Sequence, residues 1–522
     1  MTRNDYDVVV VGGGHNGLVS AAYLARAGLS VLVLERLPHV GGAAVSTQTF
    51  PGLPARLSRY SYLVSLMPEQ VMAELDLDVR LVSRRTASYT PYARDGMAGG
   101  LLVERREGEA TRRSFRELTG SDEEYDAWRR FYDEVGTFAE VVAPTLTQPL
   151  PLERDVAAKV EPELWHDLVR EPLGTAVRRR FANDTVRGVV ATDALIGTFA
   201  SLDDVSLVQN RCFLYHLVGN GTGEWRVPVG GMGSVTDALA RSAVEAGAEL
   251  VTGAGVSAIR PQGDGAEVTW HDGTREHGVT CRRVLSGVAP WVLKILLGEP
   301  EEPASKPEGS QLKINLLLER LPRLRSGIDP EVAFAGTLHL AEDYSQVEAA
   351  WAQAAAGRMP DVLPGEVYCH SLTDPSILGD LVGTGAHTMT YFGLHTPASL
   401  FEGDREAAKA QAVERALASL DEHLVEPIAS CLMTDAEGRP CLEAKVPQDV
   451  EADLAMPGGH IFHGHLEWPW APNRARLETP AQRWGVATDD EAVLLCGSGA
   501  RRGGAVSGIG GHNAARAVLE AL

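Results

Sequence analysis

Residues 6–17 read YDVVVVGGGHNG, and this stretch decides which fold the chain can adopt. Its β-branched run is typical of a buried parallel strand. The glycines behind the run have the spacing of a dinucleotide-binding turn, with Gly12, Gly14 and Gly17 at its three positions. Gly12 allows a tight turn, Gly14 lets a pyrophosphate approach the backbone, and Gly17 allows a helix to pack closely on the strand. The helix that starts here offers N–H donors and the positive end of its dipole to the phosphates.

The residues after this turn complete a strand–helix–strand unit. Apolar residues recur at helical spacing as far as Gly28, and residues 30–35, SVLVLE, form a second strand-like run that ends at Glu35. A carboxylate at this position can accept both ribose hydroxyls of a nucleotide. A lone glycine pattern is weak evidence, but these elements at these distances together predict a Rossmann-like nucleotide-binding domain.

The bulk composition narrows the remaining function classes. A length of 522 residues predicts at least two domains, and a net charge of −22 argues against nucleic acid and against a general anionic membrane surface. The first residues do not have the pattern of a signal peptide, and no apolar run has the length of a membrane span. The six cysteines are scattered, which predicts reduced thiols, no metal cluster and a cytoplasmic protein.

Further stretches carry a family resemblance. Residues 35–44, ERLPHVGGAA, place a glycine pair six residues after the acid, as in the flavin amine oxidase and phytoene desaturase superfamily. Four more stretches, which follow one another in the same order, resemble the bacterial phytoene-desaturase-like oxidoreductases: residues 56–66, 225–259, 458–464 and 497–522. The resemblance is strongest to the subgroup that includes the animal mitochondrial member. A pyridine nucleotide–disulfide reductase would need a second full fingerprint and a redox cysteine pair, and both are missing.

The resemblance implies an α/β fold in which a discontinuous Rossmann-like FAD-binding domain carries an inserted α+β substrate domain. The FAD-binding domain would comprise residues 1–75, 225–290 and 485–522, and the substrate domain 76–224 and 291–484. Because no cysteine matches a covalent flavin site, we expect non-covalent FAD. The resemblance places the following residues at the cofactor, with Val256 at the adenine and Ala505 and Val506 at the flavin ring: Gly12, Gly14, His15, Asn16, Gly17, Glu35, Arg36, Gly41, Gly42, Ala43, Ala44, Arg59, Val256, Gly497, Ser498, Ala505 and Val506.

Three side chains are candidates for the chemistry. Lys313, in an apolar strand pattern, resembles the amine-oxidase lysine that holds a water near the flavin, although an edge-strand lysine in solvent fits the same pattern. His463 could move a proton at neutral pH or could be a structural histidine bonded to backbone. Arg59 lies where family members line the flavin, as does Tyr60. Tyr215 and His216 are weaker pocket candidates by the same analogy.

Two features depart from the family pattern. Arg501 and Arg502 stand where relatives often have His-Pro, and they could hold an anionic substrate or a phosphate, or face solvent. Trp468 and Trp470 could shape a distinct pocket.

A long helix is predicted at residues 121–143, with a capping box formed by Ser121 and Glu124 and a stop at Pro144. Its stripe of aromatic residues predicts a buried face, because its polar face is acidic rather than basic.

These observations favour an FAD-dependent oxidoreductase that removes a hydride from a small-molecule carbon, gives C=C or C=N, and passes electrons to oxygen, a quinone or another acceptor. A membrane-associated carotenoid or polyene desaturase, a redox-neutral isomerase and a non-catalytic flavoprotein with a binding or assembly role stay open as alternatives.

Overall fold

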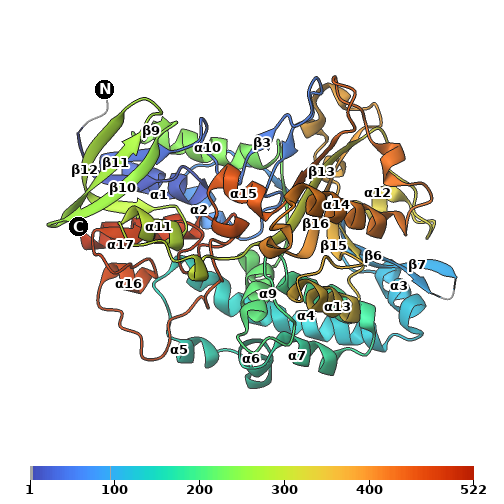
Figure 1. The fold of residues 1–522 in the computed structure, drawn as a ribbon. Helices are drawn as coiled ribbons and strands as arrows, with labels where there is room; N and C mark the ends of the chain where they lie inside the picture. The colour runs from blue at the N-terminus through green and yellow to red at the C-terminus, as the bar shows by residue number, and fades with distance from the viewer. Residues whose placement is uncertain (1–3, 95) are drawn as a thin grey trace.

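The computed structural model describes residues 4–94 and 96–522, so the first three residues of the predicted range 1–75 lie outside the described part. Figure 1 shows two sheets at opposite ends of the molecule and a group of helices that lies below the second sheet in this view. The C-terminal helix lies beside the first sheet, close to the N-terminal strand and helix (Figure 1).

The first sheet has the mixed topology of a Rossmann-like domain. Its strands run in the order β10-β11-β12-β1-β2-β9, and β18 pairs with β12. β1, β2, β9, β12 and β18 pair in parallel, whereas β10, β11 and β12 form an antiparallel meander. The strand bounds are β1 (Asp5–Val11), β2 (Val31–Glu35), β9 (Glu249–Thr252), β10 (Gly255–Gln262), β11 (Gly265–His271), β12 (Glu276–Ser286) and β18 (Val493–Leu495).

Both faces of this sheet are covered, which explains why the last four residues of β1, Val8 to Val11, are all apolar. Val8 and Val10 contribute to the core under the helices, and Val9 and Val11 to the core on the opposite face. The first strand, the following helix, its end at Gly28 (φ +88°) and the second strand are confirmed. The helices on this part of the chain are α1 (His15–Arg26), α2 (Glu69–Glu74), α10 (Met232–Glu245), α11 (Pro290–Leu296), α16 (Pro480–Trp484) and α17 (Ile509–Ala521).

The second sheet is built mainly from the later part of the chain. Its order is β17-β13-β16-β15-β14-β6-β7. The bounds are β6 (Thr86–Arg94), β7 (Met97–Glu104), β13 (Ser310–Leu318), β14 (Thr337–Leu340), β15 (Gly365–Tyr368), β16 (His387–Pro397) and β17 (Leu442–Lys445). Helices α3 (Glu109–Thr119), α12 (Pro330–Ala333), α13 (Tyr344–Ala355), α14 (Arg405–Asp421) and α15 (Pro447–Leu454) belong to the same half of the molecule.

The helical group shares one core with the inner side of the second sheet. It contains α4 (Glu123–Val142), α5 (Glu153–Ala157), α6 (Pro162–Val169), α7 (Leu173–Arg180), α8 (Asp184–Ala191) and α9 (Val208–Val218). The aromatic stripe of α4 is buried, as its acidic polar face predicted.

Two local predictions were wrong. No capping box starts α4, because Glu124 turns away and accepts the amides of Ala182 (2.6 Å) and Asn183 (3.1 Å), and Asp122 is the N-cap residue. The sequence of residues 248–259, AELVTGAGVSAI, predicts one strand after a helix, and the structure does not have it. These residues divide into β9 and β10 at Gly253, whose φ of +66° breaks the extended run.

The strands of the first sheet fall within residues 1–75, 225–290 and 485–522, and those of the second within 76–224 and 291–484. Two further strand pairs form small sheets. β3 (Ser46–Thr47) pairs with β4 (Leu57–Ser58) inside the range 1–75, and β5 (Leu81–Val82) pairs with β8 (Val227–Pro228), which lies in another range. Because β5 and β8 pair across the expected division, the domain boundaries stay a prediction. Among the described residues, no helix combines the length and apolar character that crossing a bilayer requires.

The contact between α1 and α17 generates a first prediction. A Cβ at Gly511 would lie 1.9 Å from Asn16 O, so Gly511→Ala should lower the free energy of unfolding by about 1–3 kcal/mol through overpacking. Gly136→Ala in α4 is the matched control, because its Cβ would meet no atom within 4 Å. We expect this control to gain about 0.5–1 kcal/mol from helix propensity. Urea unfolding followed by tryptophan fluorescence compares the two, and equal midpoints would contradict the assigned contact.

Candidate functional site

The turn between β1 and α1 leaves its backbone open on one side. Gly12 has φ +100°, and a Cβ at Gly17 would lie 2.2 Å from Gly12 O, so both positions require glycine. A Cβ at Gly14 would meet no atom within 4 Å. The chain therefore has no packing reason for glycine at this position, and the open space suits a ligand that approaches the backbone.

The second glycine pair lies beside this turn. The Gly41 amide donates to Gly13 O at 2.8 Å, and a Cβ at Gly42 would lie 3.2 Å from Gly14 Cα. Two segments that are far apart in the sequence thus present adjacent backbone without side chains. This side-chain-free surface at a helix N-terminus fits the pyrophosphate of a dinucleotide.

Glu35 lies at the end of β2 and holds this arrangement together. Its Oε2 accepts the Gly13 amide at 2.7 Å, and its Oε1 accepts the Leu37 amide at 2.8 Å. Each carboxylate oxygen keeps a second lone pair for a ribose hydroxyl. Arg36 extends away and donates to Asp453 O, and Val256 lies on β10 opposite Trp270. The nucleotide roles of these residues stay predictions.

The glycine-rich C-terminal segment folds back onto the start of α1. His15 Nε2 lies 3.0 Å from Ala505 O, and Asn16 Nδ2 donates to Gly503 O at 3.2 Å. Burial lowers the pKa of His15 to about 4, so its ring is neutral at physiological pH. The segment then enters α17, which places the turn at Ala505 within a few residues of a helix N-terminus.

A cavity of about 480 Å³ extends from this contact into the second half of the molecule. It brings together several residues that the sequence had singled out, namely His15, Ala43, Tyr60, His216, Lys313, Ser498, Ala505 and Val506. Aromatic side chains from α4 also line it, so part of the stripe that was interpreted as core is cavity wall. Its volume lies in the range of small-molecule binding sites.

Lys313 is a buried lysine on a central strand. β13 pairs with both β16 and β17, so the edge-strand alternative is wrong. The side chain is 4% exposed, and its Nζ donates to Ser58 O at 2.7 Å and Tyr60 O at 2.5 Å. Burial lowers its pKa well below the ordinary lysine value, although Glu443 opposes this shift. A neutral amine whose two N–H groups are used in this way keeps one free lone pair.

His463 lies at a second cavity of about 640 Å³, and Ser498 lines both cavities. Its backbone has φ +64°, and none of the described residues hydrogen-bonds to its Nδ1. Burial first, and His15 second, lower the pKa of His463 to about 4. The ring is therefore neutral at physiological pH and has an unused nitrogen.

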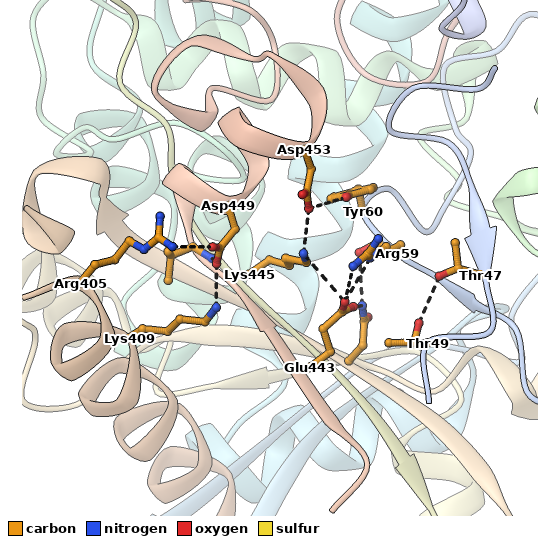
Figure 2. Close-up of polar contacts among 12 residues, drawn as sticks. Thr47, Thr49, Arg59, Tyr60, Arg405, Lys409, Glu443, Lys445, Asp449 and Asp453 are labelled. Atoms are coloured by element: carbon orange, nitrogen blue, oxygen red, sulfur yellow. Dashed lines mark hydrogen bonds and ion pairs between the residues drawn. The ribbon is translucent and has the colours of Figure 1, made fainter. Parts of the chain in front are cut away.

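The guanidinium of Arg59 is engaged by a carboxylate. Its Nη2 lies 2.8 Å from Glu443 Oε1, and Asp453 accepts hydrogen bonds from both Lys445 and Tyr60 at 2.7 Å (Figure 2). Figure 2 shows Glu443 and Lys445 of β17 joined to Asp453 of α15 and to Arg59 and Tyr60, which follow β4. A catalytic role for Arg59 would require this ion pair to open.

The two arginines of the C-terminal turn have separate environments. Arg501 donates to Trp470 O and pairs with Glu467. Arg502 is 1% exposed and donates to the carbonyls of Thr145, Gln148 and Trp484. Burial lowers the pKa of Arg502 to about 10, so it stays charged. Arg502 thus binds backbone carbonyls and does not face solvent, and it also lines the second cavity.

The tryptophan pair also serves packing. Trp468 and Trp470 stack with their ring centroids 5.1 Å apart, and Trp470 packs on Trp165 of α6. Neither ring lines the two cavities described above, so the distinct pocket stays a prediction for both. Tyr215 is buried as well and donates to Glu467 O.

The inner end of the first cavity holds residues that the sequence did not reveal. Asp193, His339, Glu366 and Tyr368 line it, and Glu342 lies directly behind His339. In the described part of the chain, His339, Glu342 and Glu366 are the group whose spacing could suit a metal ion. These residues come from separate elements, so no local motif signals them. The spacing of Glu366 and Tyr368 on β15 is the one visible hint, because alternate strand residues share a face.

Arg502 generates a stability prediction. Arg502→Met removes the donors of three carbonyls, and we expect a loss of about 3 kcal/mol or more in the free energy of unfolding. Arg501→Met is the matched control, because its ion pair is partly exposed and should cost about 1 kcal/mol at most. Urea unfolding of the two variants tests this. A larger loss for Arg501→Met would contradict the assigned environments.

Several known proteins are similar to this chain in sequence or in fold. A profile described as NAD(P)-binding Rossmann-like domain matches residues 10–70. An uncharacterized protein of Mycobacterium tuberculosis is 53% identical over 99% of this chain and 98% of its own length. Mouse pyridine nucleotide-disulfide oxidoreductase domain-containing protein 2 is 29% identical over 100% of this chain and 94% of its own length.

The solved structure of a putrescine oxidase variant covers 99% of both chains with a TM-score of 0.58 at 18% identity, which shows a shared fold. The profile described as flavin containing amine oxidoreductase matches residues 152–427, more than half of the chain. The chain therefore belongs to the flavin-containing amine oxidoreductase family and is a flavin-dependent oxidoreductase.

Proposed function

We propose that this protein uses non-covalently bound FAD to remove a hydride from a carbon of a small molecule, leaving C=N or C=C, and passes the electrons to oxygen, a quinone or another acceptor. One observation carries the proposal. A single cavity is lined by the first turn of α1, by the C-terminal turn at Ala505 and Val506, and by buried Lys313. A substrate carbon and a flavin ring could therefore meet in one enclosed space.

The residues that would hold FAD offer chemical groups that suit each part of this cofactor. The open backbone at Gly14 and Gly42 suits the pyrophosphate, and Glu35 suits the ribose. Amides near Ala505 and Val506, close to the N-terminus of α17, would favour negative charge on the flavin ring. When bound, FAD supplies the acceptor for the hydride. All six cysteines are buried free thiols, which supports non-covalent binding and a reducing compartment such as the cytoplasm.

Lys313 would contribute a fixed hydrogen-bonding group rather than a charge. Ser58 O and Tyr60 O orient its two N–H groups, and burial favours the neutral amine. The remaining lone pair can accept a hydrogen bond from a water or from a substrate N–H group. We propose that Lys313 positions such a group in the cavity and takes up its proton when the substrate is oxidised.

The cavity favours amine-like or other polar small molecules over a carotenoid. Its inner wall includes the ionisable groups of Asp193, Glu366 and Arg84, which a wholly apolar polyene would bury without offering them any hydrogen bond. A flavoprotein used only for binding or assembly would have the space beside the flavin ring filled by side chains, and no small molecule would reduce its flavin. A redox-neutral isomerase stays an alternative, which turnover without an electron acceptor would reveal.

FAD binding itself is tested at Gly14. Gly14→Val fills the open space beside the two glycine segments without a clash inside the protein, so the variant should fold but bind FAD more than about tenfold more weakly. Gly278→Val on exposed β12 is the control and should keep its flavin. Flavin absorbance after dialysis, with thermal melting as the check on folding, measures both. If the wild-type protein binds no FAD even after reconstitution, the proposed function is wrong.

The role of Lys313 is tested on the reduced enzyme. Lys313→Met should slow flavin reduction by substrate or reoxidation by oxygen by about tenfold or more, since it removes the positioned amine. Lys409→Met, which loses a lysine paired with Asp449 away from the cavity, should keep both rates. Dithionite-reduced protein is mixed with oxygenated buffer and flavin absorbance is followed by stopped flow. Fast reoxidation of the wild type indicates an oxidase, and slow reoxidation that a quinone relieves indicates a dehydrogenase. Unchanged kinetics in Lys313→Met would exclude this role.

A further inference from the structure

The inner end of the cavity is separated from Lys313 by aromatic rings. Lys313 Nζ lies 4.8 Å from the ring centroid of Tyr62, and that ring lies 4.7 Å from the ring of Tyr368. The Tyr368 hydroxyl donates to Glu366 in turn. The wall around Glu366 is therefore a region of its own, beyond the place where we expect oxidation.

Carboxylates outnumber cations in this region. Asp193, Glu342 and Glu366 supply three carboxylates, and the Arg84 guanidinium is the cation that faces them. Arg84 is already bonded to Thr337 Oγ1 (2.9 Å) and to a backbone carbonyl. Burial lowers the pKa values of His216 and His339, so neither histidine balances the carboxylate charge at neutral pH.

The carboxylate of Asp193 and one oxygen of Glu342 have no hydrogen-bond donor in the geometry of the described residues. Glu342 is 1% exposed, and its Oε1 has no partner among the described residues, although its Oε2 lies 2.6 Å from His339 Nδ1. Asp193 lines the cavity, and no described side chain or amide donates to its carboxylate. By contrast, Glu107 on the same wall accepts a hydrogen bond from Trp128 Nε1 at 3.0 Å. Buried acceptors without donors indicate a missing ligand that can donate.

We propose that this inner end is a recognition subsite for an organic cation, a protonated amine or a guanidinium group that the substrate carries away from its oxidised carbon. This proposal rests on the proposed function, which places the substrate carbon that is oxidised near Lys313. The cation would donate to Asp193 and Glu366 and would contact the faces of Tyr62 and Tyr368.

A metal ion fits the same group less well. His339 Nδ1 and Glu342 Oε2 are 2.6 Å apart, which is a hydrogen-bond distance. Two ligands of one ion with bonds of about 2.0–2.2 Å lie about 3 Å or more apart. The aromatic rings on the wall also suit an organic cation better than a hydrated ion.

Cation binding should be linked to protons. Burial raises the pKa of Asp193, and burial together with Glu342 raises the pKa of Glu366 to about 8, so the Glu366 carboxyl holds its proton at neutral pH. A bound cation lowers these pKa values and expels protons, so affinity should rise with pH. The other groups facing them are His216 of α9, His339 of β14, Tyr62, Tyr368 and Arg84, and the tyrosines and Arg84 keep their protonation state over this range.

The test is isothermal titration calorimetry with two probes of equal length, hexylammonium and 1-hexanol, on the protein as purified with its flavin content measured. We expect hexylammonium to bind about tenfold more tightly than hexanol, and more tightly at about pH 8.5 than at about pH 6.5. Asp193→Asn should reduce the preference to about threefold or less and leave hexanol binding unchanged. Glu366→Gln should do the same, and it replaces Asp193→Asn if that variant fails to fold. Glu107→Gln, whose carboxylate is already engaged on the same wall, should keep the preference.

Equal affinity for the two probes would overturn the proposal, as would a preference that survives both Asp193→Asn and Glu366→Gln. So would a stoichiometric divalent metal in the purified protein that Glu366→Gln removes, since the cluster would then be a metal site. These readouts do not depend on turnover. If the protein binds no flavin but still prefers hexylammonium, the proposed function is wrong and the subsite stands. If it binds flavin but shows no such preference, only the subsite is wrong.

Discussion

The contact between the first turn of α1 and the C-terminal segment is the constraint on which the site depends. Gly511 has no room for a Cβ against Asn16 O, so two backbones that are almost 500 residues apart touch directly. The hydrogen bond from His15 to Ala505 O belongs to the same contact. Because this contact holds the C-terminal turn over the nucleotide-binding helix, one cavity can reach from the expected flavin position to the second sheet. Arg502 supports the turn from behind by binding three backbone carbonyls, which explains how a charged side chain can be so completely buried.

Burial then sets the chemistry of the cavity. Lys313 is held by two carbonyls and is shifted toward its neutral form, whereas Lys445, one strand away, keeps an ion pair with Asp453. The same physical effect raises the pKa of Glu366 to about 8 at the other end of the space. A lysine shifted toward its neutral form at one end and carboxyl groups with raised pKa values at the other give the cavity a polarity along its length.

The membership in a family of flavin oxidoreductases agrees with this arrangement but does not settle the substrate. A shared fold supports many reactions, and specificity depends on the side chains at the site. Here the distinguishing groups come from the second sheet and from the segment at Asp193, not from the nucleotide-binding part. Relatives could therefore keep the cofactor residues and differ in the substrate that they accept.

The first strand–helix–strand unit could be predicted residue by residue, because its signals are local: the turn at Gly12 and Gly17, the period of α1 and the acid that ends β2. The rest depended on which segments pack together. Pattern alone could not exclude an edge position for Lys313, and it could not show that Arg502 turns inward or that Trp470 fills a core. Nor does any spacing rule join Asp193 to a strand more than 170 residues later. A side chain's protonation, partners and exposure are properties of its surroundings, and those surroundings exist only when distant segments have come together.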